Sequence, residues 1–256
     1  MVVKNNMEPR IILRKDTERL AEEAAVQFIK IAKQSIKHRG VFSVALAGGS
    51  TPRNCYKMLA EQTIQHQISW KDIHLFWGDE RNVPHDHIDS NYRMVREELL
   101  DKITIPGENI HPFPSNLKPE DAVESYENEI RRFFQLQSGQ FPKFDLILLG
   151  MGIDGHTASL FPNTAALKEK KHLAYANYVE AMSTVRFTLT IPVINNARIV
   201  IFLISGNSKA EILSKVLNQS GDPFFYPSRL IRPISRNLIF LIDHAAATGL
   251  PKKYLS

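Results

Sequence analysis

The chain has almost no cysteine and no long apolar run. Its one cysteine, Cys55, excludes an internal disulfide and is typical of a protein that works in a reducing compartment such as the cytoplasm. It contains no stretch of about eighteen apolar residues that would span a membrane, and residues 1–10 lack the apolar core of a signal peptide. These absences exclude a disulfide-stapled secreted scaffold, and they predict a cytoplasmic protein without a membrane partner.

The chain also lacks a concentrated basic tract. Its formal net charge is +5, but the basic residues are spread out, and the densest run, 168–171, contains Glu169. This distribution does not predict binding to nucleic acid, whereas a modest positive charge would help to attract a small phosphorylated substrate. Hydrophobic residues at 43% and charged residues at 23% are ordinary for a globular protein. We therefore expect a single domain over 1–256, present as a monomer or a weak homodimer.

Apolar runs of strand length alternate with segments of helical periodicity along the chain. Strands are predicted at 41–47, 73–77, 110–113, 144–149, 173–179, 186–191, 198–204 and 237–242. Helices are predicted from Asp16 or Thr17 to Gly40, from the turn 48–51 through Leu59, from Ser90 to about Leu100, over 119–136, from His156, from Pro192, and from about Lys209 through Val216. This alternation predicts an α/β fold with a doubly wound, mostly parallel, Rossmann-like sheet that has helices on both faces.

The segments that follow parallel strands share one edge of such a sheet, which is where α/β proteins bind their ligands. Four segments that are distant in the sequence are therefore expected to meet around one crevice. They are 48–51, 79–81, 154–156 and 206–209.

The first of these segments is rich in glycine and lies between a strand and a helix. Gly48, Gly49, Ser50 and Thr51 offer backbone N–H groups at a helix N-terminus, which is a natural seat for a phosphate group. The alternative is a tight turn with a Ser or Thr cap. The segment is not a Walker A loop, because no Gly-Lys-Ser/Thr follows it.

Charged residues lie in the segments after the strands predicted at 73–77 and 198–204, and at the start of the strand predicted at 186–191. Asp79, Glu80 and Arg81 come directly after the strand at 73–77, and they form either a solvated ion-pair cluster or a group that positions substrate and stabilises charge. Arg186 and Lys209 can add charge to the phosphate, Arg through a bidentate fork and Lys as a point charge. Taken one at a time, each is better interpreted as an ordinary surface cation.

The stretch 144–162 has the pattern of an active site. An apolar strand runs into a glycine-rich turn, and Asp154 and His156 follow at the carboxyl end of that strand. A neutral imidazole accepts a proton near pH 7, so we interpret His156 as a general base rather than as a structural histidine, with Asp154 orienting it.

Two cofactor patterns are present only in part. Glycines 150, 152 and 155 formally match the dinucleotide fingerprint, but Pro162 would end the following helix too early, and Asp154 crowds the place of the pyrophosphate. His85 and His87, with Asp86 and Asp89 nearby, lack a third metal ligand at a diagnostic spacing. We therefore predict neither an organic cofactor nor a metal.

Several motifs together resemble those of the 6-phosphogluconolactonase family. They are GGSTP at 48–52, WGDERNVP at 77–84, SNY at 90–92, GMGIDGHTASLFP at 150–162, RFTLT at 186–190 and SGNSK at 205–209. The resemblance implies hydrolysis of 6-phospho-D-glucono-1,5-lactone in the oxidative pentose phosphate pathway. It also implies the fold shared with glucosamine-6-phosphate deaminases, and a reaction without metal or organic cofactor.

The site residues and their chemistry then suggest a mechanism. His156 would take a proton from the attacking water, and Arg81 would stabilise the oxyanion. The turn 48–51 would hold the phosphate together with Arg186 and Lys209. Asp79 and Asp154 complete the expected catalytic set.

Two other functions are possible on the same fold, a glucosamine-6-phosphate deaminase and a non-catalytic sugar-phosphate sensor. The related deaminase pattern has a catalytic Glu where this chain has Phe161, which cannot ionise. A non-catalytic sugar-phosphate sensor on the same fold would be expected to carry a DNA-binding helix-turn-helix. The forty residues before Val41 predict one long helix and no second one.

Overall fold

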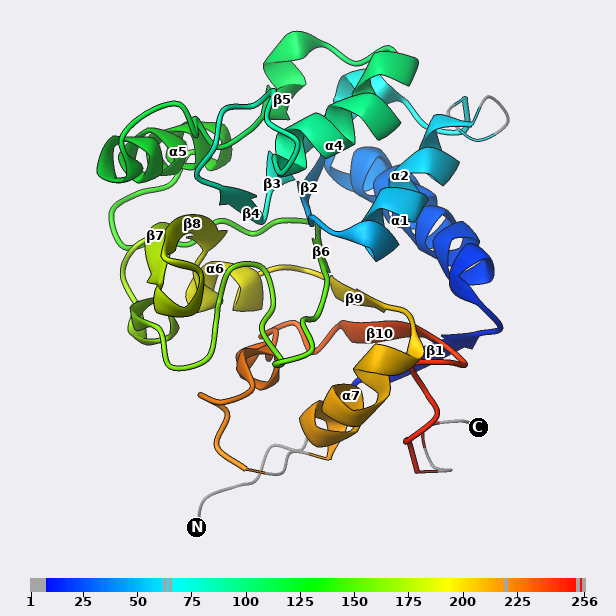
Figure 1. Ribbon diagram of the computed structural model, residues 1–256. Helices are drawn as coiled ribbons and strands as arrows, with labels where there is room; N and C mark the ends of the chain where they lie inside the picture. The colour runs from blue at the N-terminus through cyan, green and yellow to red at the C-terminus, as the bar shows by residue number, and fades with distance from the viewer. Residues whose placement is uncertain (1–7, 62–63, 65, 219–220, 252–253, 255–256) are drawn as a thin grey trace.

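The computed structural model describes residues 8–61, 64, 66–218, 221–251 and 254, so most of the N-terminal segment 1–10 lies outside the described residues. A seven-stranded sheet runs through the molecule in the order β1-β10-β9-β6-β2-β3-β5, and every pair in it is parallel (Figure 1). Its strands are β1 (Arg10–Arg14), β2 (Phe42–Leu46), β3 (Ile73–Trp77), β5 (Ile110–His111), β6 (Leu146–Leu149), β9 (Val200–Ile204) and β10 (Leu238–Asp243). The predicted parallel α/β fold is confirmed.

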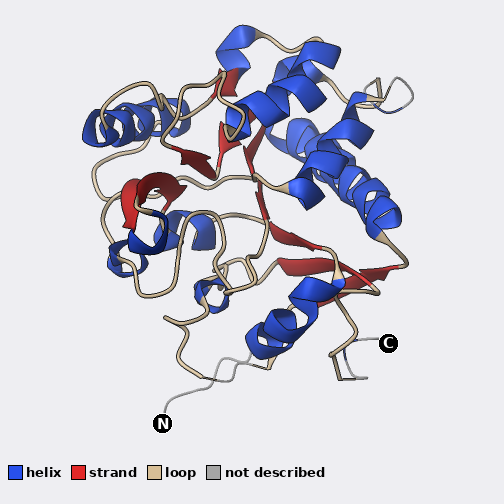
Figure 2. Ribbon diagram, in the orientation of Figure 1, coloured by secondary structure: helices blue, strands red, loops and turns tan. Residues whose placement is uncertain are grey.

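Helices cover both faces of this sheet. In Figure 2, α1 and α2 lie on the right of the strands, while α5 and α6 lie on the left. The α-helices are α1 (Thr17–Arg39), α2 (Ser50–Ala60), α4 (Asn91–Glu98), α5 (Pro119–Phe134), α6 (Ile191–Asn195) and α7 (Ala210–Leu217). Short 3-10 turns are η1 (Trp70–Asp72), η2 (Leu100–Lys102), η3 (Gly107–Asn109), η4 (Ala165–Lys168), η5 (Glu180–Met182), η6 (Asn207–Lys209) and η7 (Pro227–Leu230). No helix in these described ranges is long and apolar enough to cross a membrane.

The predicted ends of α1 are correct. Asp16 accepts a hydrogen bond from the backbone N–H of Arg19, and Gly40 closes the helix at φ 77° in the left-handed region that favours glycine. Strands β2, β6 and β9 are buried at every position, which explains why their sequences are apolar without alternation, except for the buried Ser43 in β2.

The sheet reverses its direction of growth between β2 and β6. From β2 the chain adds β3 and then β5 on one side, whereas β6, β9 and β10 follow on the other. A crevice opens at such a switch point, because the connections after the two strands diverge to opposite faces. The turns after β2 and β6, which contain Gly48 and Gly150, flank this crevice.

A second, three-stranded antiparallel sheet was not predicted. It has the order β4-β8-β7, with β4 at Asp79–Arg81, β8 at Thr184–Leu189 and β7 at Ala174–Val179. The predicted strands at 173–179 and 186–191 therefore exist, but they pair here and not in the parallel sheet. The charged segment after β3 is itself a strand, so its interpretation as a solvated loop is wrong.

The short helix predicted from His156 is also wrong. Gly155 and Ala158 adopt left-handed φ angles of 81° and 47°, and an isolated bridge joins Thr157 to Leu160. Side chains replace helical hydrogen bonds here, since the Thr157 hydroxyl donates to the Gly150 carbonyl at 2.8 Å. The segment is a folded loop that lies against the small sheet.

Candidate active site

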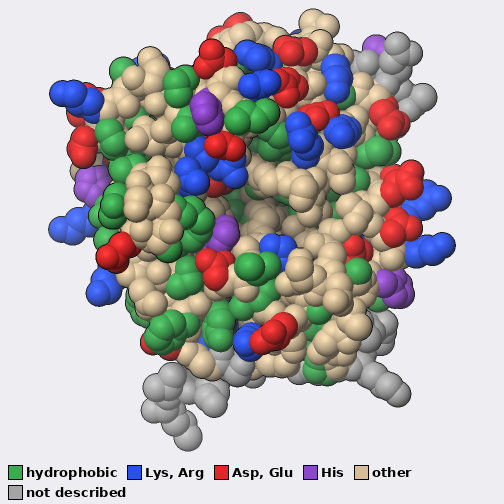
Figure 3. Space-filling view, viewed as in Figure 1, with side chains coloured by type: hydrophobic (Ala, Val, Ile, Leu, Met, Phe, Trp, Pro, Cys, Tyr) green, Lys and Arg blue, Asp and Glu red, His purple; other side chains and the backbone are tan. Residues whose placement is uncertain are grey.

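A cavity of about 220 Å³ lies at the switch point, where the four distant segments meet. Figure 3 shows the molecule hollowed on the face that Figure 1 presents, with Lys and Arg side chains bordering the hollow. The predicted site residues that line the cavity are Gly48, Gly49, Ser50, Thr51, Asp79, Arg81, His156 and Lys209. Asp154 does not line the cavity but is bonded to His156, which does. Arg186 does not line it either and lies beside Arg81, its register partner in the small sheet.

The turn after β2 presents the start of α2 to this cavity. Gly49 has φ 99° and is the N-cap residue, with no side-chain hydrogen bond capping the helix. Backbone N–H groups at a helix start, together with the helix dipole, favour a bound anion. Gly48 is required for a different reason, because a Cβ atom there would lie 2.1 Å from Oδ1 of Asn91.

Buried polar residues hold the segment Asp79–Arg81 in place. The carboxylate of Glu80, only 1% exposed, accepts hydrogen bonds from the backbone N–H groups of Arg81, Asn91 and Tyr92 and from the hydroxyl of Ser90. Two of these donors form the first turn of α4, whose dipole favours the negative charge. Burial nevertheless raises the pKa of Glu80 above its ordinary value, with the hydrogen bonds acting in the opposite direction.

Asn91 links this segment to the anion-binding turn. Its side-chain amide donates to the backbone carbonyl of Asp79 at 2.9 Å, and the same side chain packs against Gly48. The Asp79 carboxylate in turn accepts a hydrogen bond from the Ser159 hydroxyl at 2.9 Å. The motifs that contain Asn91 and Glu80 do not reveal these contacts, since the contacts depend on packing between distant segments.

His156 and Asp154 form a directed pair in the loop after β6. Nδ1 of His156 lies 2.6 Å from Oδ1 of Asp154, and the backbone N–H of His156 donates to the same oxygen at 3.1 Å. A carboxylate on Nδ1 holds the proton on that nitrogen, so Nε2 is left to accept one. A Cβ atom at Gly152 would lie 2.1 Å from Nδ1, which is why this position has no side chain.

The environment keeps Asp154 ionised. Burial acts to raise its pKa, but the hydrogen bonds and charge of His156 outweigh burial and leave the pKa below the ordinary value. The His156 side chain is 28% exposed, and its ring packs on Phe161 at a centroid distance of 4.3 Å. The imidazole is therefore fixed on two sides and open to the cavity.

The loop that carries His156 is held by η7 from the C-terminal part of the chain. Ser228 donates to the Gly155 carbonyl through its backbone N–H at 2.9 Å and through its hydroxyl at 2.8 Å. Tyr226 packs against Gly155, where an added Cβ would lie 3.1 Å from its ring. No pattern in the sequence indicates a role for Ser228, which lies far from the glycine-rich motif along the chain.

Lys209 ends η6 and lies within electrostatic range of Asp154. Burial lowers the pKa of Lys209, while the Asp154 carboxylate acts to raise it. Asp243, at the end of β10, accepts hydrogen bonds from the Ser205 hydroxyl at 2.5 Å and from the backbone N–H of Gly206 at 3.1 Å. Gly206 has φ 96°, so this turn needs glycine to bring Lys209 back to the cavity.

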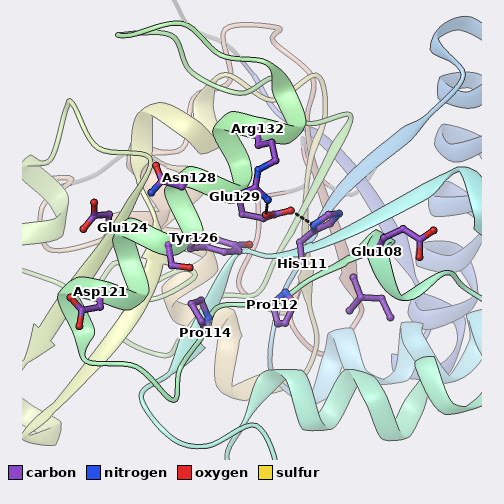
Figure 4. Close-up of a pocket in the computed structure, with 12 residues that line it drawn as sticks. Glu108, His111, Pro112, Pro114, Asp121, Glu124, Tyr126, Asn128, Glu129 and Arg132 are labelled. Atoms are coloured by element: carbon purple, nitrogen blue, oxygen red, sulfur yellow. Dashed lines mark hydrogen bonds and ion pairs between the residues drawn. The ribbon is translucent and has the colours of Figure 1, made fainter.

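A larger groove of about 720 Å³ lies elsewhere, between α5 and the segment around β5 (Figure 4). Four of its ten labelled side chains are acidic, namely Glu108, Asp121, Glu124 and Glu129, and Arg132 is the one labelled cation of Lys or Arg type. His111 is bonded there to Glu129 at 2.9 Å. A phosphorylated substrate would be repelled by these carboxylates. The smaller cavity, with glycine turns and cations, is the better candidate.

The metal pattern around His85 has no counterpart in three dimensions. His85 lies 2.7 Å from the carbonyl of Phe113 through Nε2, and its ring packs on Tyr92. Within the described ranges, no three residues of metal-binding type gather at one point.

The fold and site define an α/β protein with a crevice at the switch point of a parallel sheet, lined by a glycine-rich helix start, Arg81, His156 and Lys209. Residues 15–240 match the family model described as glucosamine-6-phosphate isomerases/6-phosphogluconolactonase, and the chain belongs to this family. It is 44% identical over 245 residues to a 6-phosphogluconolactonase of Synechocystis sp., covering 95% of this chain and 99% of that protein. It is 36% identical to a 6-phosphogluconolactonase of Haemophilus influenzae, over 79% of this chain and 85% of that one.

Solved structures agree with this assignment. The 6-phosphogluconolactonase of Trypanosoma brucei superposes with a TM-score of 0.83 at 31% identity, covering 95% of this chain and 99% of that chain. The enzyme of Thermotoga maritima gives 0.78 at 32% identity, with 92% and 99% covered. A monomeric glucosamine-6-phosphate deaminase shares the fold, with a TM-score of 0.77 at 22% identity, 94% of this chain and 100% of that one.

Proposed function

We propose that the chain hydrolyses 6-phospho-D-glucono-1,5-lactone to 6-phosphogluconate, with His156 as the general base. One observation carries the proposal: the His156–Asp154 pair faces the same cavity as the anion-binding turn 48–51 and Lys209. The family membership and the lactonase names of the relatives support the same reaction.

The phosphate is held at the start of α2. The N–H groups of the turn 48–51 and the ammonium of Lys209 bind it, and Ser50 and Thr51 add hydroxyl groups. Anchoring the remote phosphate fixes the lactone ring in the cavity, which lowers the entropic part of the barrier.

The chemistry takes place at the ester carbon C1. Nε2 of His156 takes a proton from a water molecule as its oxygen attacks C1, and Asp154 keeps the imidazole oriented and stabilises its positive charge. The guanidinium of Arg81, which lines the cavity, stabilises the oxyanion. Asp79 positions its neighbours, since its carboxylate accepts a hydrogen bond from Ser159 and its backbone carbonyl accepts one from Asn91.

The deaminase alternative meets a specific obstacle in this site. Phe161, at the position where the deaminase pattern has a catalytic Glu, is 7% exposed and packs on the His156 ring. Its place against the base leaves no ionisable group there to move a second proton.

The decisive assay measures acid release from the phosphorylated lactone above its spontaneous rate, alongside ammonia release from glucosamine 6-phosphate. We expect enzymatic lactone hydrolysis and no ammonia. Ammonia release would support the deaminase, and binding of either ligand without turnover would support a sensor.

A second assay tests the phosphate seat. Lys209→Ala should raise KM by about tenfold with a small effect on kcat, as for loss of one charge-assisted contact. The matched control is Lys215→Ala on α7, whose ammonium pairs with Glu211 at 2.6 Å on the surface. An unchanged KM in Lys209→Ala would remove Lys209 from the phosphate site.

A further inference from the structure

Two arginines lie directly opposite each other in the small antiparallel sheet. Arg81 on β4 and Arg186 on β8 are register partners. Side chains of such a pair project from the same face with Cβ atoms about 4.5–5.5 Å apart, so like charges repel there. The pKa of Arg186 is lowered accordingly, by burial first and then by the charge of Arg81.

Neither guanidinium forms an ion pair with a carboxylate in the part of the chain that the structure describes. Arg81 donates to the backbone carbonyl of Asp89, and Arg186 contacts the sulfur of Met182 at 3.8 Å. Of the carboxylates that act on Arg186, Asp79 binds Ser159 and Glu80 binds the start of α4, while Asp89 is exposed and lies beside His87. The pair is therefore a concentration of positive charge that an anion would stabilise.

This pair lies away from the proposed phosphate seat. In Figure 1, β4 and β8 lie to the left of β6, whereas the turn from β2 into α2 and the start of α7 lie to its right. Arg81 lines the cavity from the β4 side, and Lys209 lines it from the α7 side. Figure 3 likewise shows Lys and Arg side chains at separate places around the hollow.

Hydrolysis of the lactone creates a second anion at the opposite end of the substrate from the phosphate. Water adds to C1, the bond from C1 to the ring oxygen breaks, and that oxygen takes a proton. The C1 acid then loses a proton and becomes a carboxylate. A phosphate on C6 that is held by the turn 48–51 and Lys209 leaves C1, at the other end of the six-carbon chain, to face Arg81.

We propose that Arg81 and Arg186 together bind the C1 carboxylate of the product, so that Arg186 belongs to the carboxyl end of the site and not to the phosphate end. The inference rests on the proposed function and replaces the phosphate role that the sequence suggested for Arg186. The same pair faces the oxyanion during the reaction, and the planar fork of Arg186 suits a carboxylate better than an ammonium would.

The test compares two ligands that differ only at C1. Calorimetric titration measures Kd for 6-phosphogluconate and for D-glucitol 6-phosphate, which has the same carbon chain and phosphate but a C1 alcohol. Arg186→Ala should weaken 6-phosphogluconate by about tenfold and leave glucitol 6-phosphate almost unchanged. Arg186→Lys should recover part of the loss. Arg19→Ala, which removes an exposed α1 arginine paired with Glu22, is the control and should change neither.

Equal weakening of both ligands would place Arg186 at the phosphate and overturn the inference, as would no weakening of either. Both results leave the proposed function standing, because lactone hydrolysis by the unaltered chain is measured separately. Absence of hydrolysis would refute the proposed function itself. Should the alanine variant not fold, Arg186→Gln keeps the aliphatic stem and serves in its place.

Discussion

Replacing Gly48 with alanine tests how the anion-binding turn is tied to the rest of the site. The new Cβ would lie 2.1 Å from Oδ1, 2.5 Å from Cγ and 2.7 Å from Nδ2 of Asn91, so the whole amide must move. Asn91 is 1% exposed, and its Nδ2 bonds to the Asp79 carbonyl at 2.9 Å. Moving the amide therefore breaks a buried hydrogen bond between α4 and β4, next to the turn.

The magnitude follows from these two costs. Overpacking a buried position costs about 1–3 kcal/mol, and leaving a buried carbonyl without its donor costs about 1–3 kcal/mol. We expect Gly48→Ala to lower the free energy of unfolding by about 3 kcal/mol, and Asn91→Ala alone to lower it by about 2 kcal/mol. In the double variant the new methyl group occupies space that the amide has left. The decrease in the free energy of unfolding of the double variant should therefore be smaller than the sum of the two single decreases by at least about 1 kcal/mol.

Urea denaturation of the four proteins measures this coupling, with KM for the lactone as a second readout. Gly48→Ala should raise KM, because it displaces the turn that we propose to hold the phosphate. The control is Gly107→Ala, since an exposed Cβ there would meet nothing within 4 Å. It should change the stability by less than about 1 kcal/mol. Strictly additive losses in the double variant would refute the contact between Gly48 and Asn91.

Three further predictions concern Asp154, Ser228 and the half-buried His74. Asp154→Asn should lower kcat by about 10–10³-fold with KM little changed. Because the pKa of Asp154 is lowered in the folded protein, its contribution to stability is complete above the ordinary Asp pKa. It is lost as the pH falls through the lower folded value. Unfolding curves of the unaltered chain and of Asp154→Asn should therefore converge in acid. Ser228→Ala should lower kcat severalfold without changing KM, since it frees the loop that carries the base; an unchanged kcat would remove Ser228 from this positioning role. Burial first, and His111 second, lower the pKa of His74 from 6.5 to about 4, so its contribution to stability is present above pH 6.5 and is lost as the pH falls towards 4. His74→Asn should flatten that decline, and an equal slope in both proteins would contradict it.

The parallel sheet was predictable because its central strands are buried on both faces and must be apolar throughout. The turns after them were predictable for the same reason, since glycine and capping residues end each run at one edge. The ends of α1 followed from Asp16 and Gly40, whose local hydrogen bonding and φ angle need no tertiary information.

The small sheet was not predictable as a separate sheet, because the pattern indicates strands β7 and β8 but not which strands they pair with. Strand β4 consists of Asp79, Glu80 and Arg81, and only pairing with β8 makes it a strand. The position of Arg186 beside Arg81 depends on that register, which the sequence alone does not reveal. The loop after His156 was predicted as a helix, because composition does not reveal that Ala158 takes a left-handed φ, which breaks a helix.

The edge strand β1 was missed for a related reason. It holds five residues at the rim of the sheet, next to β10, and its burial is only partial. Short edge strands present no buried run and no clear alternation, and pairing with β10 from the other end of the chain establishes them.

The central claim is that an imidazole at this sheet edge removes a proton from water. The most direct measurement is kcat for 6-phospho-D-glucono-1,5-lactone in the unaltered chain and in His156→Ala, each corrected for spontaneous hydrolysis. We predict a decrease of about 10²–10⁴-fold in kcat, with the Kd of 6-phosphogluconate little changed. A His156→Ala protein that turns over the lactone at the full rate would contradict it.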